Sequence, residues 1–456
     1  MNKNLDYIAC PLPEDIRRAK DHGDLALASR LIELRLADAR IPEILKERLR
    51  FEERILSELP EIYPLSAAET LRLFSEFVRD FTEEDLERLR YEGTCDWIYL
   101  NGEVRYHEDC VATALHTRKE LHARLFDPSS LRKDEEISRR ENAMIAKMKR
   151  EGHAAMRFRL RTTLTIDPEA ERPGERILVH MPLPVTAFQS RAGRIMTEPK
   201  CAYIAAETEP QRTASWDVIY EPGTRFVTEA DWEIDAPYIR TDFQKVSSDQ
   251  PDFDTEEQLP EIRFTPFVRS LAAELTGGEK NPLIKARRFY DYITQNCRYR
   301  YVRPYYMDTC IPETFGTGQM GDCGMHALLF ISLCRASGIP ARWQAGLYTP
   351  PWETGMHDWA QFYVAPYGWL FADGSFGGSA FRDGNPERQD FYFGNLDPWR
   401  CVYNTALQQE FDPPKKHFRY DPYDSQSPEV EYEDRGLNRS EFTVHRELLL
   451  CEENGH

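Results

Sequence analysis

Cys323 is the residue of this chain whose surroundings best suit covalent chemistry. It lies in the tetrapeptide GDCG, directly before the apolar run 325–336, and the Gly-Ile-Pro segment 338–340 is typical of a helix end. This pattern predicts that Cys323 begins a buried helix. Unpaired backbone N–H groups and the helix dipole favour a thiolate at that position. We therefore expect a depressed pKa for the Cys323 thiol and the fastest reaction among the ten cysteines.

A predicted β-hairpin supplies a base and a carboxylate. The β-forming runs 357–364 and 369–373 flank a turn at 365–368, with His357 at the start of the first arm and Asp373 at the end of the second. With a four-residue turn Asp373 falls opposite Ala360, so its contact with His357 requires a bulge, a longer turn or side chains that reach diagonally. A thiol, an imidazole that takes its proton and a carboxylate that orients the imidazole are the parts of nucleophilic acyl chemistry.

An oxyanion formed in such a reaction needs hydrogen-bond donors. The backbone N–H of Cys323 is the natural first donor, because a helix start points such groups outward. Gln319, four residues upstream, either supplies a second donor from its side-chain amide or lies in a surface loop. His326, one turn along the predicted helix, either faces the site or packs as a structural histidine.

The elements that must position these residues indicate an α+β protein of several domains. Residues 1–150 show helical periodicity and a short β-hairpin at 97–106, where an Asn-Gly pair suits a type I′ turn. Period-two alternation begins near Ala155, and we predict an antiparallel β-sandwich over 151–248. Residues 259–400 form the predicted catalytic core, and 401–456 are expected to be a C-terminal extension that packs on it.

Composition narrows the classes of partner and cofactor. The 456 residues carry a formal net charge of −19, which opposes a phosphate backbone, so nucleic acid is not an expected partner. No apolar run approaches the roughly 20 residues of a membrane span, and the N-terminus has no signal-peptide pattern, so we expect a cytoplasmic protein with no membrane partner. The sequence shows no Cys-x-x-Cys pair, zinc motif or phosphate loop, and we expect neither cofactor nor metal.

Two segments carry a family resemblance. They resemble the transglutaminase-like superfamily, whose papain-like core has a Cys at a helix start and a His and an Asp on neighbouring strands. The two segments are GDCGMHALLFISLCRASGIPAR and MHDWAQFYVAPYGWLFADGSF. The resemblance covers roughly residues 260–400. It implies that Cys323 is the nucleophile, His357 the general base and acid, and Asp373 the orienting acid. Asp358 departs from the small or apolar residues familiar after that histidine, and we expect its carboxylate to raise the histidine's pKa.

The sequence thus favours a thiol-dependent enzyme that acts on peptide or carboxamide bonds of a peptide or protein substrate. Hydrolysis is favoured over amine transfer, because water is always present and no acceptor site is identifiable. The alternative is a non-catalytic binding or scaffold protein that retains the core. The helical region 1–150 would recognise a protein partner, roof the cleft or simply cover an exposed sheet.

Overall fold

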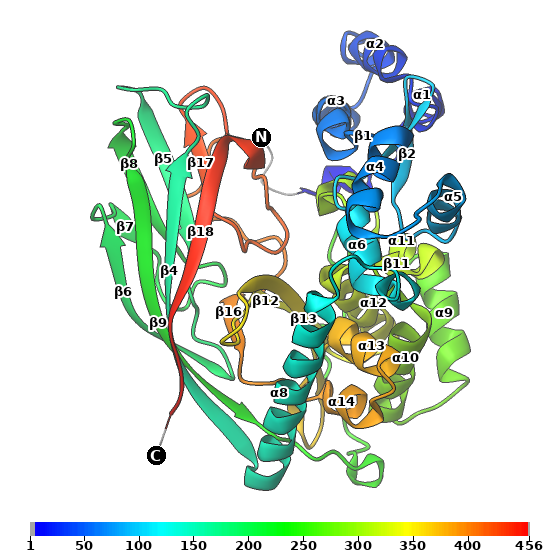
Figure 1. The fold of residues 1–456 in the computed structure, drawn as a ribbon, viewed down its shortest axis with the longest axis vertical. Helices are drawn as coiled ribbons and strands as arrows, with labels where there is room; N and C mark the ends of the chain where they lie inside the picture. Colours follow the sequence, from blue (N-terminus) through cyan, green and yellow to red (C-terminus); the bar gives the residue numbers. More distant parts are fainter. Residues whose placement is uncertain (1–4, 455–456) are drawn as a thin grey trace.

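The structure of this protein is a computed structural model that describes residues 5–454. It is a mixed α+β fold (Figure 1). In that view most helices lie on one side of the molecule and two β-sheets on the other, and a long helix near the bottom runs between them. All ten cysteines are free thiols. Within residues 5–454, no helix is both long and apolar enough to cross a membrane.

Most of residues 5–151 is helical. The elements are η1 (Leu5–Ala9), α1 (Glu14–Asp21), α2 (Leu25–Leu36), α3 (Glu43–Ile62), α4 (Ala67–Phe77), α5 (Glu83–Tyr91), α6 (Cys110–Thr117), α7 (Lys119–His122) and α8 (Ser129–Glu151), with strands β1 (Leu65–Ser66), β2 (Trp97–Leu100) and β3 (Glu103–Tyr106). The β2–β3 hairpin turns at Asn101 and Gly102, whose φ angles of 51° and 83° are those a type I′ turn requires.

Two four-stranded sheets follow, and each is completed by a strand from the C-terminus. One has the order β18-β4-β9-β6 and the other β17-β5-β8-β7. Their strands are β4 (His153–Ile166), β5 (Arg176–Pro182), β6 (Ser190–Glu198), β7 (Tyr203–Ile204), β8 (Thr213–Ile219), β9 (Arg225–Pro237), β17 (Glu429–Tyr432) and β18 (Phe442–Glu453). Side chains such as Leu164, Trp216 and Val430 join both sheets in one buried cluster.

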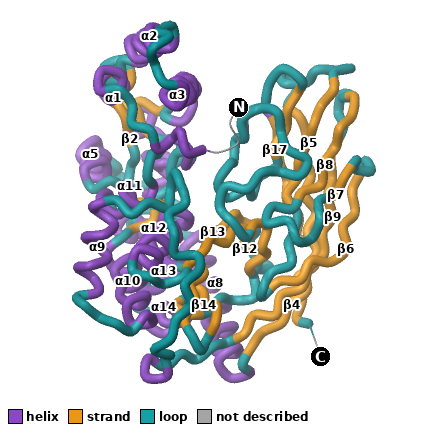
Figure 2. The backbone as a smooth tube through the Cα atoms, turned by 180° about the vertical axis from the view of Figure 1, so that it is seen from behind, coloured by secondary structure: helices purple, strands orange, loops and turns teal. Residues whose placement is uncertain are grey.

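The sequence analysis predicted that the C-terminal segment packs on the core. The structure shows that this segment also adds one strand to each of the two sheets. β17 pairs with β5, and β18 pairs along almost the whole of β4. The long loop before β17 takes a different course and lies between the sheets and the helices (Figure 2). In that loop Tyr423 donates a 3.0 Å hydrogen bond to buried Glu261, which ties the loop to the core.

The core combines a five-stranded antiparallel sheet with six α-helices. The sheet has the order β15-β14-β13-β12-β16, and a separate parallel pair joins β10 to β11. The elements are η2 (Phe243–Lys245), α9 (Pro266–Thr276), α10 (Pro282–Asn296), β10 (Arg298–Tyr299), η3 (Tyr305–Met307), α11 (Ile311–Gly318), β11 (Met320–Gly321), α12 (Cys323–Ala336), β12 (Ala341–Tyr348), β13 (Gly355–Val364), β14 (Gly368–Ala372), α13 (Gly374–Arg382), α14 (Pro386–Phe391), β15 (Phe393–Gly394) and β16 (Arg400–Asn404), with η4 (Arg439–Glu441) before β18.

Helix α12 is the centre of this core. Every residue from Cys323 to Arg335 is buried, which explains the apolar composition of the helix on all sides. It packs on β12 and β13, and Gly338, at φ 74°, follows its end in the left-handed conformation that favours glycine. The helix thus holds its first residue, Cys323, at a fixed place beside the start of β13.

Candidate active site

The N-terminus of α12 is built around Asp322. Its side chain caps the helix by accepting the Met325 N–H at 3.2 Å, and it also accepts the Tyr305 hydroxyl at 2.7 Å. The close approach of Tyr305 requires glycine at 324, where a Cβ would lie 2.1 Å from the Tyr305 oxygen. Cys323, the first helical residue, is held between these groups and is 9% exposed.

His357 and Asp373 meet as a hydrogen-bonded pair. His357 Nε2 lies 2.8 Å from Asp373 Oδ2, and because a carboxylate accepts, Nε2 carries the proton and Nδ1 is left as the basic nitrogen. The imidazole is packed against Phe376 and Trp359, with ring centroids 4.9 Å and 5.9 Å away. Both members of the pair are buried.

The hairpin register explains this contact and corrects the sequence-based alignment. Val364 and Gly368 are the last residues that pair across the hairpin, so the loop between them has three residues, 365–367. Further along the strands, Ala360 pairs with Ala372. Asp373 is therefore level with Trp359, not with Ala360 as a four-residue turn would place it. His357 lies two residues before Trp359 on the same strand face, so Asp373 reaches it diagonally.

Asp373 is fixed by more than the histidine. As the N-cap of α13 its Oδ1 accepts the Phe376 N–H at 3.0 Å and the Ser375 hydroxyl at 3.1 Å, while Arg400 donates to Oδ2 at 2.9 Å. Burial alone would raise the pKa of Asp373, but the charges of His357 and Arg400 outweigh it and hold that pKa below its usual range. The carboxylate is thus permanently ionised at neutral pH.

The pKa of His357 differs from the one expected from the sequence. Burial lowers the pKa of His357, and the attraction of Asp373 only partly opposes this effect. The predicted rise caused by Asp358 is therefore wrong, because desolvation dominates and the Asp358 carboxyl is directed to Cys323. A neutral imidazole with a free Nδ1 is suited to accept a proton.

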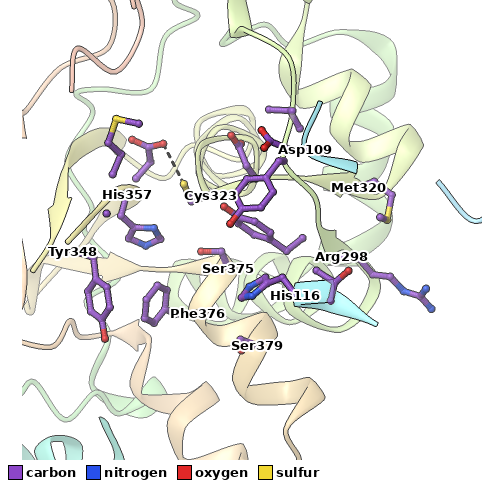
Figure 3. A pocket seen from close by; sticks show the side chains of 18 of the residues that line it. Asp109, His116, Arg298, Met320, Cys323, Tyr348, His357, Ser375, Phe376 and Ser379 are labelled. Carbon is purple, nitrogen blue, oxygen red and sulfur yellow. Dashed lines mark hydrogen bonds between the residues drawn. The ribbon is translucent and has the colours of Figure 1, made fainter. Parts of the chain in front are cut away.

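The Cys323 thiol makes its hydrogen bond with Asp358. Sγ lies 3.4 Å from Oδ2 of that carboxyl (the dashed line in Figure 3). Burial raises the pKa of Cys323 well above its usual value, and the nearby Asp358 and Asp322 raise it further. The depressed pKa predicted from the helix start is wrong, because the loss of water and two carboxylates outweigh the helix N–H groups.

Gln426 connects the C-terminal loop to the site. Its Nε2 donates to the backbone carbonyl of His357 at 3.0 Å and also to Oδ1 of Asp358. Sequence analysis missed Gln426 and Arg400, because both lie outside the two segments that carry the resemblance and neither belongs to a pattern. Arg400 is the first residue of β16, which pairs with β12. A strand position of this kind does not by itself indicate a contact with Asp373.

The other two sequence candidates lie apart from the thiol's contacts. Gln319 is exposed, ends α11 at φ 54°, and donates from Nε2 to the Tyr292 hydroxyl at 3.3 Å, which argues against its predicted oxyanion role. His326 is buried, donates from Nδ1 to the Asp322 carbonyl at 2.6 Å and packs on Phe315. Burial lowers its pKa to about 4, as suits a packed histidine.

Cys323 and His357 open onto one large cavity of about 1950 Å³ (Figure 3). Its walls come from the N-terminal helical region, the core and the C-terminal segment. Asp109 and His116 belong to the helical N-terminal region, Cys323 and His357 to the core, and Gln426 to the C-terminal loop. Within the described residues 5–454, no group of three or more His, Cys, Asp or Glu side chains is arranged to hold a metal ion.

Comparisons with known proteins bear on the core. Residues 269–374 match the family model described as the transglutaminase-like superfamily, a span that includes Cys323, His357 and Asp373. The search of curated proteins gave no match.

Among solved structures, the chain is similar to a candidate cysteine protease from Cytophaga hutchinsonii, with 15% identity, a TM-score of 0.44, and coverage of 67% of this chain and 93% of the other. It is also similar to the periplasmic domain of TgpA from Pseudomonas aeruginosa, with 14% identity, a TM-score of 0.27, and coverage of 54% and 95%. The similarity to the transglutaminase-like superfamily thus lies within residues 269–374.

Proposed function

We propose that this protein is a thiol-dependent acyl-transfer enzyme that hydrolyses peptide or carboxamide bonds. The observation that carries the proposal is the 2.8 Å hydrogen bond between His357 and Asp373, in which His357 lines the same cavity as Cys323. Cys323 is the nucleophile, His357 the general base and acid, and Asp373 the residue that orients the imidazole.

The first half of the reaction forms a thioester. The Cys323 proton moves to Nδ1 of His357, and the sulfur attacks the carbonyl carbon while the carbonyl electron pair moves to oxygen. The backbone N–H of Cys323, at the start of α12, is available to the oxyanion. As the tetrahedral intermediate collapses, the imidazolium gives its proton to the leaving amine.

The second half resolves the thioester. Neutral His357 takes a proton from water, the hydroxide attacks the acyl carbon, and the thiolate leaves and is reprotonated. Asp373 remains ionised throughout, because Arg400 and His357 both stabilise its charge. We favour hydrolysis over transfer to an amine, because water is always present and no acceptor site is identifiable.

The N-terminal helical region is proposed to select the substrate. Its residues Asp109 and His116 line the cavity that contains Cys323. The region is also anchored to the core: Glu141 pairs with Arg388 at 2.8 Å, and Glu58 accepts the Tyr306 hydroxyl at 2.7 Å. A protein substrate in the cavity would therefore contact both regions at once.

A second candidate is a binding protein that retains the core without catalysis. The observation that favours it is the thiol's hydrogen bond to Asp358, a carboxyl that together with burial raises the pKa of Cys323 well above its usual value. Cleavage of a diverse peptide library by the purified protein, in parallel with Cys323→Ala, distinguishes the two.

Catalysis predicts carboxylic-acid products from the wild-type protein, and amide products would appear beside them on addition of a primary amine if transfer competes. Equal product from wild type and Cys323→Ala would refute the assignment of Cys323. Saturable peptide binding without any product would favour the binding protein.

A further inference from the structure

Asp358 is a buried carboxyl in direct contact with the atom that would react. It follows His357 on β13 and is 3% exposed. One oxygen, Oδ2, accepts the Cys323 thiol at 3.4 Å, and the other, Oδ1, accepts the side-chain amide of Gln426. Both oxygens are therefore engaged, and no part of the proposed acyl chemistry requires this residue.

Gln426 holds that carboxyl from a loop that is hydrogen-bonded to the Asp421 carboxylate. Three successive backbone N–H groups, those of Ser425, Gln426 and Ser427, donate to the Asp421 carboxylate at 3.2, 2.8 and 3.0 Å. The Gln426 side chain is 2% exposed and also donates to the His357 carbonyl. One amide thus fixes the backbone of the base and the carboxyl that holds the nucleophile.

The charges around this contact oppose a thiolate. The carboxyls of Asp322, Asp421 and Asp373 face Asp358, and burial together with these neighbours raises the pKa of Asp358 well above its usual value. Desolvation raises the pKa of Asp322, which is half-buried, to about 6. Removing the thiol proton would place a sulfur anion among these groups, and their charges together with burial raise the pKa of the Cys323 thiol.

We propose that Asp358, fixed by Gln426, is a positioning residue that holds the Cys323 thiol protonated and hydrogen-bonded away from His357 in the resting enzyme. The proposal rests on the proposed function only in taking Cys323 as the nucleophile. Activation then requires the thiol to leave Oδ2, after which its proton passes to Nδ1 of His357 and the S–H electron pair stays on sulfur. The reactivity of the nucleophile is therefore set by residue 358 and by the C-terminal loop.

The test is the rate of Cys323 alkylation by iodoacetamide between pH 6 and 10, followed by peptide mapping. Asp358→Asn keeps the size of the side chain and removes its charge. We expect the variant to label Cys323 at least tenfold faster at pH 7 and its rate profile to move at least one pH unit lower, since the thiolate fraction changes tenfold per unit. Glu353→Gln is the matched control, because Glu353 lines the same cavity and the thiol's carboxyl contact is with Asp358. It should label at the wild-type rate.

Gln426→Ala provides a second variant that leaves Asp358 in place. It removes the amide that orients the carboxyl, and we expect faster labelling than wild type but slower than Asp358→Asn. Should Asp358→Asn fail to fold, judged by circular dichroism and thermal melting, Gln426→Ala decides the matter.

Wild-type or slower labelling in the folded variants overturns the proposal. Alkylation needs no turnover, so a protein without acyl-transfer activity still gives an answer. If Asp358→Asn labels at the wild-type rate while Cys323→Ala and His357→Ala still abolish turnover, only the role of Asp358 is overturned and the proposed function stands.

Discussion

Asp373→Asn separates the role of the orienting carboxylate from its structural role. The residue accepts from His357, Arg400, Ser375 and the Phe376 N–H. An asparagine retains the size and one acceptor for the helix cap, but it removes the charge. It also offers an N–H toward His357, so the imidazole is no longer held with its proton on Nε2.

The expected effects follow from these contacts. In serine proteases the equivalent Asp→Asn change lowers kcat by about 10⁴-fold through the wrong histidine tautomer, and we expect about 10³- to 10⁴-fold here. Breaking a buried ion pair costs about 3–5 kcal/mol of unfolding free energy. The lower end is expected, because Arg400 keeps Asp397 as a partner at 2.7 Å.

The pH at which stability is measured decides how much of this cost is seen. Because the pKa of Asp373 is lower in the folded state than its usual value of 3.8, its contribution to stability is present above that value. It is lost as the pH falls through the folded-state pKa. Measurements at pH 7 therefore report the full difference between wild type and variant.

The assay pairs kcat and KM on the best library substrate with urea denaturation at pH 7. A loss confined to kcat, with about 3 kcal/mol of lost stability, supports the orienting role. A kcat within tenfold of wild type would refute it. A variant that is unfolded at 25 °C would show instead that Asp373 is needed for the fold, and the matched variant Asp397→Asn would then measure the loss of an Arg400 partner without changing the histidine's carboxylate.

Three further predictions concern the nucleophile, its ionisation and the N-terminal region. Cys323→Ala should abolish turnover with a melting temperature close to wild type, whereas His357→Ala should abolish turnover and also lower the melting temperature, because it leaves the buried Asp373 carboxylate without this partner; residual turnover above the uncatalysed rate in either variant would exclude the substituted residue from the chemistry. Wild-type Cys323 should label with iodoacetamide more slowly than half-buried Cys10 at pH 7 and its rate should still rise above pH 9, since burial and Asp358 raise its pKa; a plateau below pH 8 would contradict this. Deletion of residues 1–150 should give insoluble protein, because it removes Glu141 from buried Arg388 and Phe51 from its contact with Tyr306; a soluble monomer by size-exclusion chromatography would show that the region is separable.

Local patterns made much of the core predictable. The apolar run after Cys323 and its Gly-Ile-Pro end identified α12, and the two β-forming runs identified the β13–β14 hairpin. These signals depend on residues a few positions apart. The register was missed by one residue, because the number of loop residues is decided by backbone geometry at 365–367 that a sequence pattern does not fix.

Long-range contacts were the part that sequence patterns did not provide. Arg400 and Gln426 reach the site through the placement of β16 and of the loop before β17. The ionisation of Cys323 and His357 was mispredicted for the same reason, because burial depends on elements far away along the chain. The pairing of β18 with β4 had a signal in its alternating residues, but alternation alone does not identify a partner strand.

The most direct test of the central claim is mass-spectrometric detection of an acyl group on Cys323. The full-length protein is mixed with a peptide that it cleaves, quenched in acid within the first turnovers, digested and mapped. We predict an acyl mass on the peptide that contains Cys323, lost on hydroxylamine treatment as a thioester requires and absent in Cys323→Ala. Turnover that continues in Cys323→Ala, or an acyl group found on another residue, would contradict the account.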